Sequence, residues 1–212
     1  MQPKSVEIEL TTRCPIKCPA CPRTYRKTHE NYPDWDNGHI NPETVYKVID
    51  DSYFDSIRFV GSFGDAIYHP NFVDIMARVC NVSKRIKVET NGAHRKPKFW
   101  KQVSELPWDN NRIKEIAFSI DGLKDTNHIY RKGSNWDSIM TAVDTLASGT
   151  HKPTLIWQML IFPYNQHQVE EAKSMYKSLG FDEFRASKSL RKYLPKWFEN
   201  DQEGKNIDWN YT

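Results

Sequence analysis

Three cysteines near the start of the chain are the residues whose type and spacing could do chemistry. Cys14, Cys18 and Cys21 follow the pattern C-x3-C-x2-C and are three of only four cysteines in 212 residues. Thiolates bind zinc and iron–sulfur clusters, and thiols grouped this closely are more typical of a metal site than of disulfides. The spacing therefore indicates a metal centre.

Two kinds of metal centre are compatible with these cysteines. Three thiolates can hold three corners of a [4Fe–4S] cluster and leave the fourth iron open to another ligand. The alternative is a tetrahedral zinc site, completed by His29 or His39. Small zinc modules usually fold as units of their own, whereas these cysteines directly follow a predicted strand at the head of a long α/β pattern. That context favours the cluster.

Composition limits the partners. The net charge of +3 is the small difference between 30 basic and 27 acidic side chains, so it makes no case for a nucleic-acid or membrane partner. No apolar run is long enough to span a bilayer, and the first residues are not followed by the apolar core of a signal peptide. Clustered thiols without a secretion signal predict a cytoplasmic protein.

Strands and helices are predicted to alternate along the chain. Residues 56–61, 85–90, 114–120, 154–162 and 181–186 have strand patterns, as does the alternating segment 5–11. Helical patterns cover 41–51, 70–80, 97–105 and 166–179, and a further helix is capped by Asn135. Residues 12–40 look like a long polar loop. The alternation predicts an α/β domain with about six parallel β/α units, as an incomplete TIM-type barrel or an open doubly wound sheet.

The unusual residue clusters all follow predicted strands. The cysteines follow the first strand, residues 61–65 the second, Asn91-Gly92 the third and Asp121-Gly122 the fourth. Ligands of parallel α/β folds bind at the carboxyl ends of the strands. We therefore expect these clusters to meet at one site.

A strand followed by C-x3-C-x2-C resembles the start of the radical S-adenosylmethionine (SAM) enzymes. The resemblance extends over about residues 6–186 and implies the partial barrel. It also implies one [4Fe–4S] cluster on Cys14, Cys18 and Cys21, whose open iron chelates SAM. In this family an electron from the cluster cleaves SAM, and the resulting 5′-deoxyadenosyl radical abstracts a hydrogen atom from the substrate. The electron comes from a donor such as flavodoxin or ferredoxin.

Two further segments extend the resemblance. FVGSFGDAIYHP at 59–70 is similar to the segment that binds the SAM amino group, with Gly64 and Asp65 at its Gly-Glu positions. Aspartate replaces the usual glutamate and Ala66 replaces proline, so backbone carbonyls could take over this contact. ETNGA at 89–93 is similar to the TNG segment, which implies that Thr90 and Asn91 face the ribose or methionine part of SAM.

Residues 117–143 resemble the fourth-strand region of the peptide-modifying subgroup, which includes the SPASM-domain enzymes. Ser119 and Asp121 would then lie near the ribose hydroxyls, and Arg131 would pair with the SAM carboxylate. Leu160 of the fifth strand would pack against adenine.

The cysteine count separates this chain from the SPASM enzymes. Cys80 is the only cysteine after Cys21, and it lies on an apolar helical pattern, which is typical of a small buried hydrophobe. We therefore expect no auxiliary cluster. Residues 1–187 should form the core, and residues 188–212 a helical or irregular tail whose aromatic side chains pack on it.

The resemblance also bears on the substrate. The subgroup resemblance makes a peptide or protein the first expectation, with a small metabolite or nucleotide next. Candidate substrate-facing residues are Glu9, Glu89, Gln158 and Arg185. The alternatives to the enzyme are an iron–sulfur or zinc protein that does not cleave SAM, and a member that binds SAM without turnover because of the changes at Asp65 and Ala66.

Overall fold

The chain folds around one six-stranded parallel sheet. The structure is a computed structural model that describes residues 4–29, 38–51, 53–82, 84–108 and 113–189. The strands are β1 (Ser5–Ile8), β2 (Ser56–Phe59), β3 (Arg85–Thr90), β4 (Lys114–Ser119), β5 (Thr154–Ile161) and β6 (Glu183–Lys188). Their order in the sheet is their order in the sequence, and every neighbouring pair is parallel. The predicted α/β fold with six parallel units in an incomplete barrel is confirmed.

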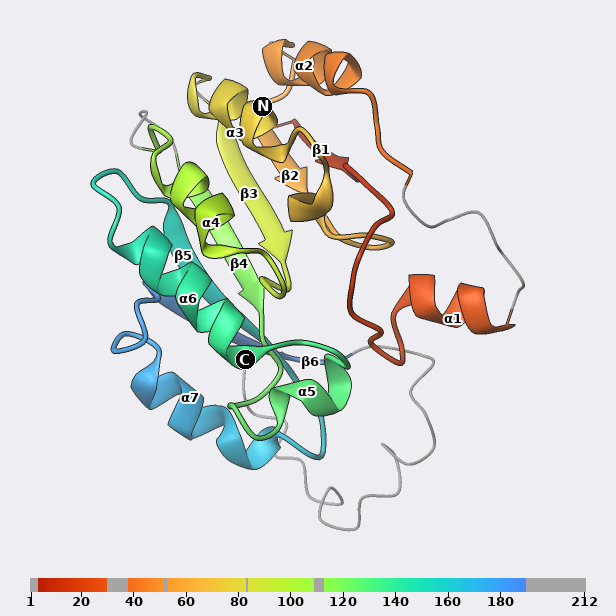
Figure 1. Ribbon diagram of the computed structural model, residues 1–212, viewed down its shortest axis with the longest axis vertical. Coiled ribbons are helices and arrows are strands. Elements are labelled where there is room, and N and C mark those ends of the chain that lie inside the picture. Colours follow the sequence, from red (N-terminus) through yellow and green to blue (C-terminus); the bar gives the residue numbers. More distant parts are fainter. Residues whose placement is uncertain (1–3, 30–37, 52, 83, 109–112, 190–212) are drawn as a thin grey trace.

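Helices connect the strands (Figure 1). They are α1 (Pro22–His29), α2 (Pro42–Asp50), α3 (Phe72–Cys80), α4 (Pro97–Ser104), α5 (Asn127–Tyr130), α6 (Trp136–Ala147) and α7 (Val169–Met175), with short 3-10 turns η2 (Ala66–Tyr68) and η3 (Gln166–Gln168). Figure 1 shows α3, α4, α6 and α7 lying over one face of the sheet. No helix in the described ranges is long and apolar enough to cross a membrane.

The two faces of the sheet differ in chemistry because successive strand residues point to opposite sides. The helix-covered face buries apolar side chains such as Val88 of β3 and Phe118 of β4. The opposite face carries interleaved charges. Its ion pairs join Arg58 to Glu7 and Glu89, Lys87 to Glu89, and Arg185 to Glu115 and Glu183. The inner face of this partial barrel is therefore polar, unlike the packed interior of a complete TIM barrel.

Helix-start signals in the sequence match the structure. The Asn41 side chain accepts a hydrogen bond from the Glu43 N–H, and Pro42 is the first residue of α2. The Asn135 side chain accepts from the Ser138 N–H at the start of α6. Cys80 ends α3 and is fully buried, as expected for a small hydrophobe.

Some predicted elements differ from the structure. The first strand was expected to reach Thr11 but ends at Ile8, because Leu10 and Thr12 exchange backbone hydrogen bonds with Ile40 and Gly38 instead of with β2. The loop predicted over residues 12–40 contains α1. This helix is mostly polar, so it lacks the apolar repeat by which a helix is predicted. The last strand runs to Lys188, and the predicted tail after residue 189 lies outside the described residues.

Candidate functional site

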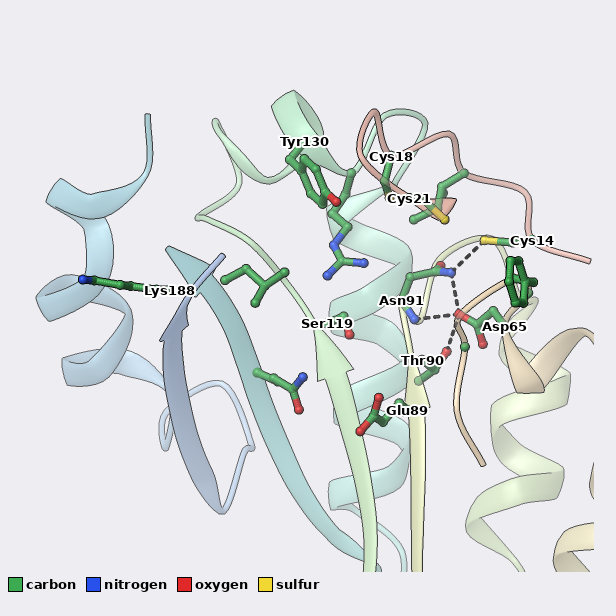
Figure 2. A pocket seen from close by; sticks show the side chains of 17 residues that line it. Cys14, Cys18, Cys21, Asp65, Glu89, Thr90, Asn91, Ser119, Tyr130 and Lys188 are labelled. Atoms are coloured by element: carbon green, nitrogen blue, oxygen red, sulfur yellow. Dashed lines mark hydrogen bonds between the residues drawn. The ribbon is translucent and has the colours of Figure 1, made fainter. Parts of the chain in front are cut away.

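One cavity of about 380 Å³ lies at the carboxyl ends of the strands (Figure 2). It is lined by Cys14, Ile16, Cys18, Cys21, Gly61, Phe63, Gly64, Asp65, Glu89, Thr90, Asn91, Ser119, Tyr130, Arg131, Gln158, Leu160 and Lys188. Its volume is in the range of small-molecule sites, roughly 300–1,000 Å³. The expectation that the strand-end clusters meet at one site is met for the cysteines and for the loops after β2 and β3.

The three cysteines reach this cavity from the loop that leaves β1. Cys18 is buried, Cys14 and Cys21 are half-buried, and none of them forms a disulfide. The Cys21 N–H donates to the Cys18 carbonyl at 3.1 Å, which turns the loop tightly. The Asn91 side-chain amide donates to the Cys14 sulfur at 3.5 Å, so the loop after β3 holds the first cysteine in place.

Burial keeps two of these thiols protonated in the absence of a cation. Burial, followed by the nearby Asp65 carboxylate, raises the pKa of Cys14 to about 12. Burial also raises the pKa of Cys18 to about 11, although the Arg131 guanidinium opposes this rise. A metal group with positive charge would have to displace these protons, so its binding releases protons.

Asp65 lies at the centre of a buried network between the loops after β2 and β3. Its Oδ2 accepts hydrogen bonds from Thr90 Oγ1 at 3.0 Å, from the Asn91 N–H at 2.7 Å and from the Asn91 amide, while Oδ1 accepts from the Ile67 N–H at 3.3 Å. Figure 2 shows this chain of contacts continuing through Asn91 to Cys14. Burial raises the pKa of Asp65 to about 6, and the hydrogen bonds oppose that rise. The carboxylate thus organises Thr90 and Asn91.

Gly64 brings the loop after β2 against the start of the cysteine loop. A Cβ atom at this position would lie 1.8 Å from the Thr11 carbonyl oxygen. The close approach lets the Asp65 N–H donate to the Arg13 carbonyl at 2.9 Å, directly before Cys14. Gly64 therefore has a steric role in addition to lining the cavity.

Arg131 and Asp121 form a buried ion pair beside the cysteines. Arg131 Nε lies 2.6 Å from Asp121 Oδ2, and the Asp121 side chain is fully buried. The other carboxylate oxygen accepts from the Leu160 N–H at 2.7 Å. Burial by itself would lower the pKa of Arg131, but the Asp121 carboxylate outweighs it and raises the pKa above its ordinary value. The ion pair with Asp121 uses Nε, and the same guanidinium also lies beside the Cys18 thiol.

The structure brings seven of the eight predicted SAM residues to the cavity. These are Gly64, Asp65, Thr90, Asn91, Ser119, Arg131 and Leu160. Asp121 is the exception, because its carboxylate is enclosed between Arg131 and β5 and does not line the cavity. In the structure its carboxylate holds Arg131 and the backbone of Leu160.

Two of the four residues expected to face the substrate line the cavity. Glu89 and Gln158 do so. Glu9 instead accepts hydrogen bonds from the backbone N–H groups of Ser62 and Phe63. Arg185 pairs with Glu115 and Glu183 lower on the inner face of the sheet. Glu9 and Arg185 therefore have structural partners outside the cavity lining.

Two prominent lining residues were not predicted from the sequence. Lys188 was assigned to the tail, but β6 extends far enough to bring it to the cavity. Tyr130 belongs to α5, a helix of four residues that is too short to give a periodic signal. Lys188 is the register partner of Ile161, the last residue of β5. Its place beside the cavity therefore follows from how far β5 and β6 extend, which the local sequence does not show.

The chemistry of the donor set fits a metal group bound by thiolates. Among the described residues, no three His, Cys, Asp or Glu side chains are arranged to hold a metal ion. The three free thiols instead stand around one cavity, with an amide N–H donating to a sulfur and a guanidinium beside them. His39, one candidate for a zinc site, does not line the cavity and packs against His69. The side chain of His29 lies outside the described part of the chain.

Comparison with known proteins identifies the family. Residues 8–175 match the model of the radical SAM superfamily, which is most of the chain. The chain belongs to this superfamily, and membership implies SAM and an iron–sulfur cluster as cofactors. The resemblance seen in the cysteine motif is thereby confirmed.

The individual proteins that match this chain share little sequence identity with it. The chain is 24% identical over 196 residues to the tungsten-containing aldehyde ferredoxin oxidoreductase cofactor-modifying protein of Pyrococcus furiosus, covering 88% of this chain and 52% of that protein. The structure of anSMEcpe with bound AdoMet and Cp18Cys peptide matches with a TM-score of 0.59 at 16% identity, over 90% of this chain and 55% of that one. SuiB of Streptococcus suis bound to precursor peptide SuiA matches with a TM-score of 0.67 at 11% identity, over 87% and 39%. The chain spans about half the length of the curated relative, and the two structural matches support the fold.

Proposed function

We propose that this protein is a radical SAM enzyme that uses one [4Fe–4S] cluster. The observation that carries the proposal is the meeting of three free cysteines from one loop with the ends of β2 to β5 around one cavity. Cys14, Cys18 and Cys21 would hold the cluster. When bound, the cluster and SAM together supply the electron and the 5′-deoxyadenosyl radical that abstracts a hydrogen atom from the substrate.

Different residues of the chain would hold and orient SAM beside the cluster. Arg131 presents NH₂ groups suited to the SAM carboxylate, and Asp121 keeps that guanidinium in place. Asp65 holds Thr90 and Asn91 at the mouth of the cysteine loop, so its own carboxylate is not free for the SAM amino group. Backbone carbonyls near Gly64 would take that contact. Ser119 lies toward the ribose and Leu160 offers an apolar surface for adenine.

The side of the cavity away from the cysteines carries the substrate contacts. Glu89 is held ionised: burial opposes ionisation, but the hydrogen bonds and charges of Arg58 and Lys87 outweigh it and lower the pKa of Glu89. The Gln158 side chain accepts a hydrogen bond from Lys87 at 3.3 Å. An ionised carboxylate and an amide favour a substrate with N–H or O–H donors. We propose a peptide, since anSMEcpe and SuiB were both solved with peptides. The reducing cytoplasm is the compartment proposed for this chemistry.

The proposal is tested by anaerobic reconstitution with iron and sulfide, reduction by dithionite and addition of SAM. Formation of 5′-deoxyadenosine is expected. The Cys21→Ala variant should lose iron and the product, while Cys80→Ala, which removes a buried thiol that does not line the cavity, should keep both. A protein that binds iron and sulfide but makes no 5′-deoxyadenosine with any reductant would contradict the enzyme.

The peptide is tested separately by transfer of label. Synthetic peptides deuterated at carbon are added in pools, and 5′-deoxyadenosine is analysed by mass spectrometry. Deuterium from the peptide pools supports a peptide substrate. Transfer from deuterated nucleosides or free amino acids alone would replace the peptide by a small metabolite or nucleotide.

A further inference from the structure

Two segments around the cysteine loop carry basic side chains and no acidic ones. Residues 10–29 contain Arg13, Lys17, Arg23, Arg26 and Lys27, and none of the 27 acidic residues of the chain. Residues 126–136, which include α5, also contain no acidic residue. Residues 92–104, with Arg95, Lys96, Lys98 and Lys101, are a further basic segment without acidic residues, but this segment carries no cysteine.

The fold brings the two segments together. The Lys17 N–H donates to the Lys132 carbonyl at 2.8 Å, which joins the cysteine loop to the residues after α5. Arg23 Nη1 donates to the carbonyl of Ile16 at 3.4 Å, which places the start of α1 against the same loop. Figure 1 shows α1 projecting from the body of the molecule beside the chain that leaves β1.

We define the basic rim as Lys17, Arg23, Arg26 and Lys132. Lys17 and Lys132 are exposed, and Arg23 and Arg26 are half-buried on α1. The Arg26 guanidinium lies 5.6 Å from the ring centroid of Phe63, which itself lines the cavity. None of the four residues lines the cavity. The rim therefore lies on the segments that hold or adjoin the cysteines, outside the cavity lining.

We propose that the basic rim is the docking surface for an acidic protein that carries single electrons. The inference rests on the proposed function, which requires one electron per SAM cleaved and therefore a reduced donor. In the docked complex the donor loses one electron and the cluster gains it, and no bond or proton is transferred between the two proteins. Cations around a shallowly buried redox site attract an acidic carrier and orient it so that its own cofactor faces the cysteine loop.

Physical considerations favour an electron carrier over an acidic substrate at this surface. A substrate must reach the cavity, and none of the four rim residues lines it. Electron-transfer partners bind through small, weak interfaces that are dominated by charge. Four cations within two joined segments match that type of interface.

The test uses the cluster-loaded protein, an acidic ferredoxin as probe, and two double variants of equal charge change. Lys17→Glu/Lys132→Glu reverses two charges of the rim. Lys101→Glu/Lys177→Glu reverses two exposed charges, on α4 and after α7, and serves as the control. Affinity is measured by isothermal titration calorimetry at low and high salt, and 5′-deoxyadenosine is measured with either ferredoxin or dithionite as reductant.

The rim variant should bind ferredoxin about tenfold more weakly or worse at low salt, and the difference should shrink at high salt because ions screen exposed charges. Its product formation with dithionite should equal that of the wild type, while formation with ferredoxin falls. Equal ferredoxin affinity in the rim variant and the wild type, or an equal loss in the control, would overturn the proposal. So would a rim variant that keeps ferredoxin affinity and loses binding of an acidic peptide. If the wild type makes no 5′-deoxyadenosine with dithionite, the proposed function is refuted. The ferredoxin affinities still test the docking surface, because they do not depend on product formation.

Discussion

Replacing Gly64 with alanine tests whether the close approach of two loops builds the site. The new Cβ would lie 1.8 Å from the Thr11 carbonyl oxygen and 2.6 Å from its carbon, whereas real Cβ contacts stay beyond 3.0 Å. The backbone segments at Gly64 and at Thr11 must therefore separate by about 1.2 Å. Overpacking of this kind costs about 1–3 kcal/mol. Loss of the hydrogen bond from the Asp65 N–H to the Arg13 carbonyl adds about 1 kcal/mol.

The expected loss of stability is therefore about 2–4 kcal/mol, which lowers the melting temperature of a chain of this size by about 5–15 °C. Thermal unfolding followed by circular dichroism measures it, and urea titration gives the free energy of unfolding. Gly149→Ala is the matched control, since its Cβ would meet Ser104 and Leu146 carbonyl oxygens at 3.2 and 3.3 Å and needs only a small adjustment. A Gly64→Ala variant as stable as Gly149→Ala would refute the steric argument. Because Arg13 precedes Cys14, Gly64→Ala should also retain less iron after reconstitution.

Three further predictions concern the buried groups of the site. Asp121→Ala should cost about 3–5 kcal/mol in urea unfolding because it leaves the buried Arg131 guanidinium without its carboxylate, and Asp121→Ala/Arg131→Leu should recover part of that loss. Cys21→Ala should abolish the visible absorbance of the reconstituted cluster, and retention of that absorbance would remove Cys21 from the ligand set, with Cys80→Ala as the control that keeps the colour. Burial raises the pKa of Asp65 from 3.8 to about 6, so the stability contributed by this group is present below its unfolded pKa and is lost as the pH rises through 6. The free energy of unfolding of the apoprotein should therefore fall by roughly 1–3 kcal/mol between about pH 4 and pH 7, and Asp65→Asn should remove that fall.

Most of the fold could be predicted from local patterns. Strands such as β3 and β5 carry apolar residues that alternate with polar ones or run continuously, and helix starts such as Asn41 and Asn135 carry cap residues. The elements that were missed have weak local signals. α1 is polar and short, and α5 consists of a single turn, so both depend on tertiary contacts that no sequence window contains.

The site was predictable where a motif sits directly at the end of a strand. The parallel sheet brings such motifs together whatever their other features, which is why the cysteines, Asp65 and Asn91 meet. Side-chain direction was not predictable in the same way. Asp121 follows β4 like the others, yet its carboxylate turns away to pair with Arg131 and the β5 backbone. Lys188 lines the cavity because β6 pairs with β5 as far as Ile161, and this register has no local sequence signal.

The sequential order of the strands has a consequence for the synthesis of the protein. Each β/α unit can pair with the one before it as soon as it emerges, so the sheet can grow from β1 toward β6 during translation. The cavity, however, takes residues from both ends of this series, from Cys14 beside β1 to Lys188 in β6. Its wall is complete only after the last strand has joined. The cysteines are thus the first part of the site to be synthesised and the last to be enclosed. Until β6 has joined the sheet, metal binding and oxidation compete for the same three thiols.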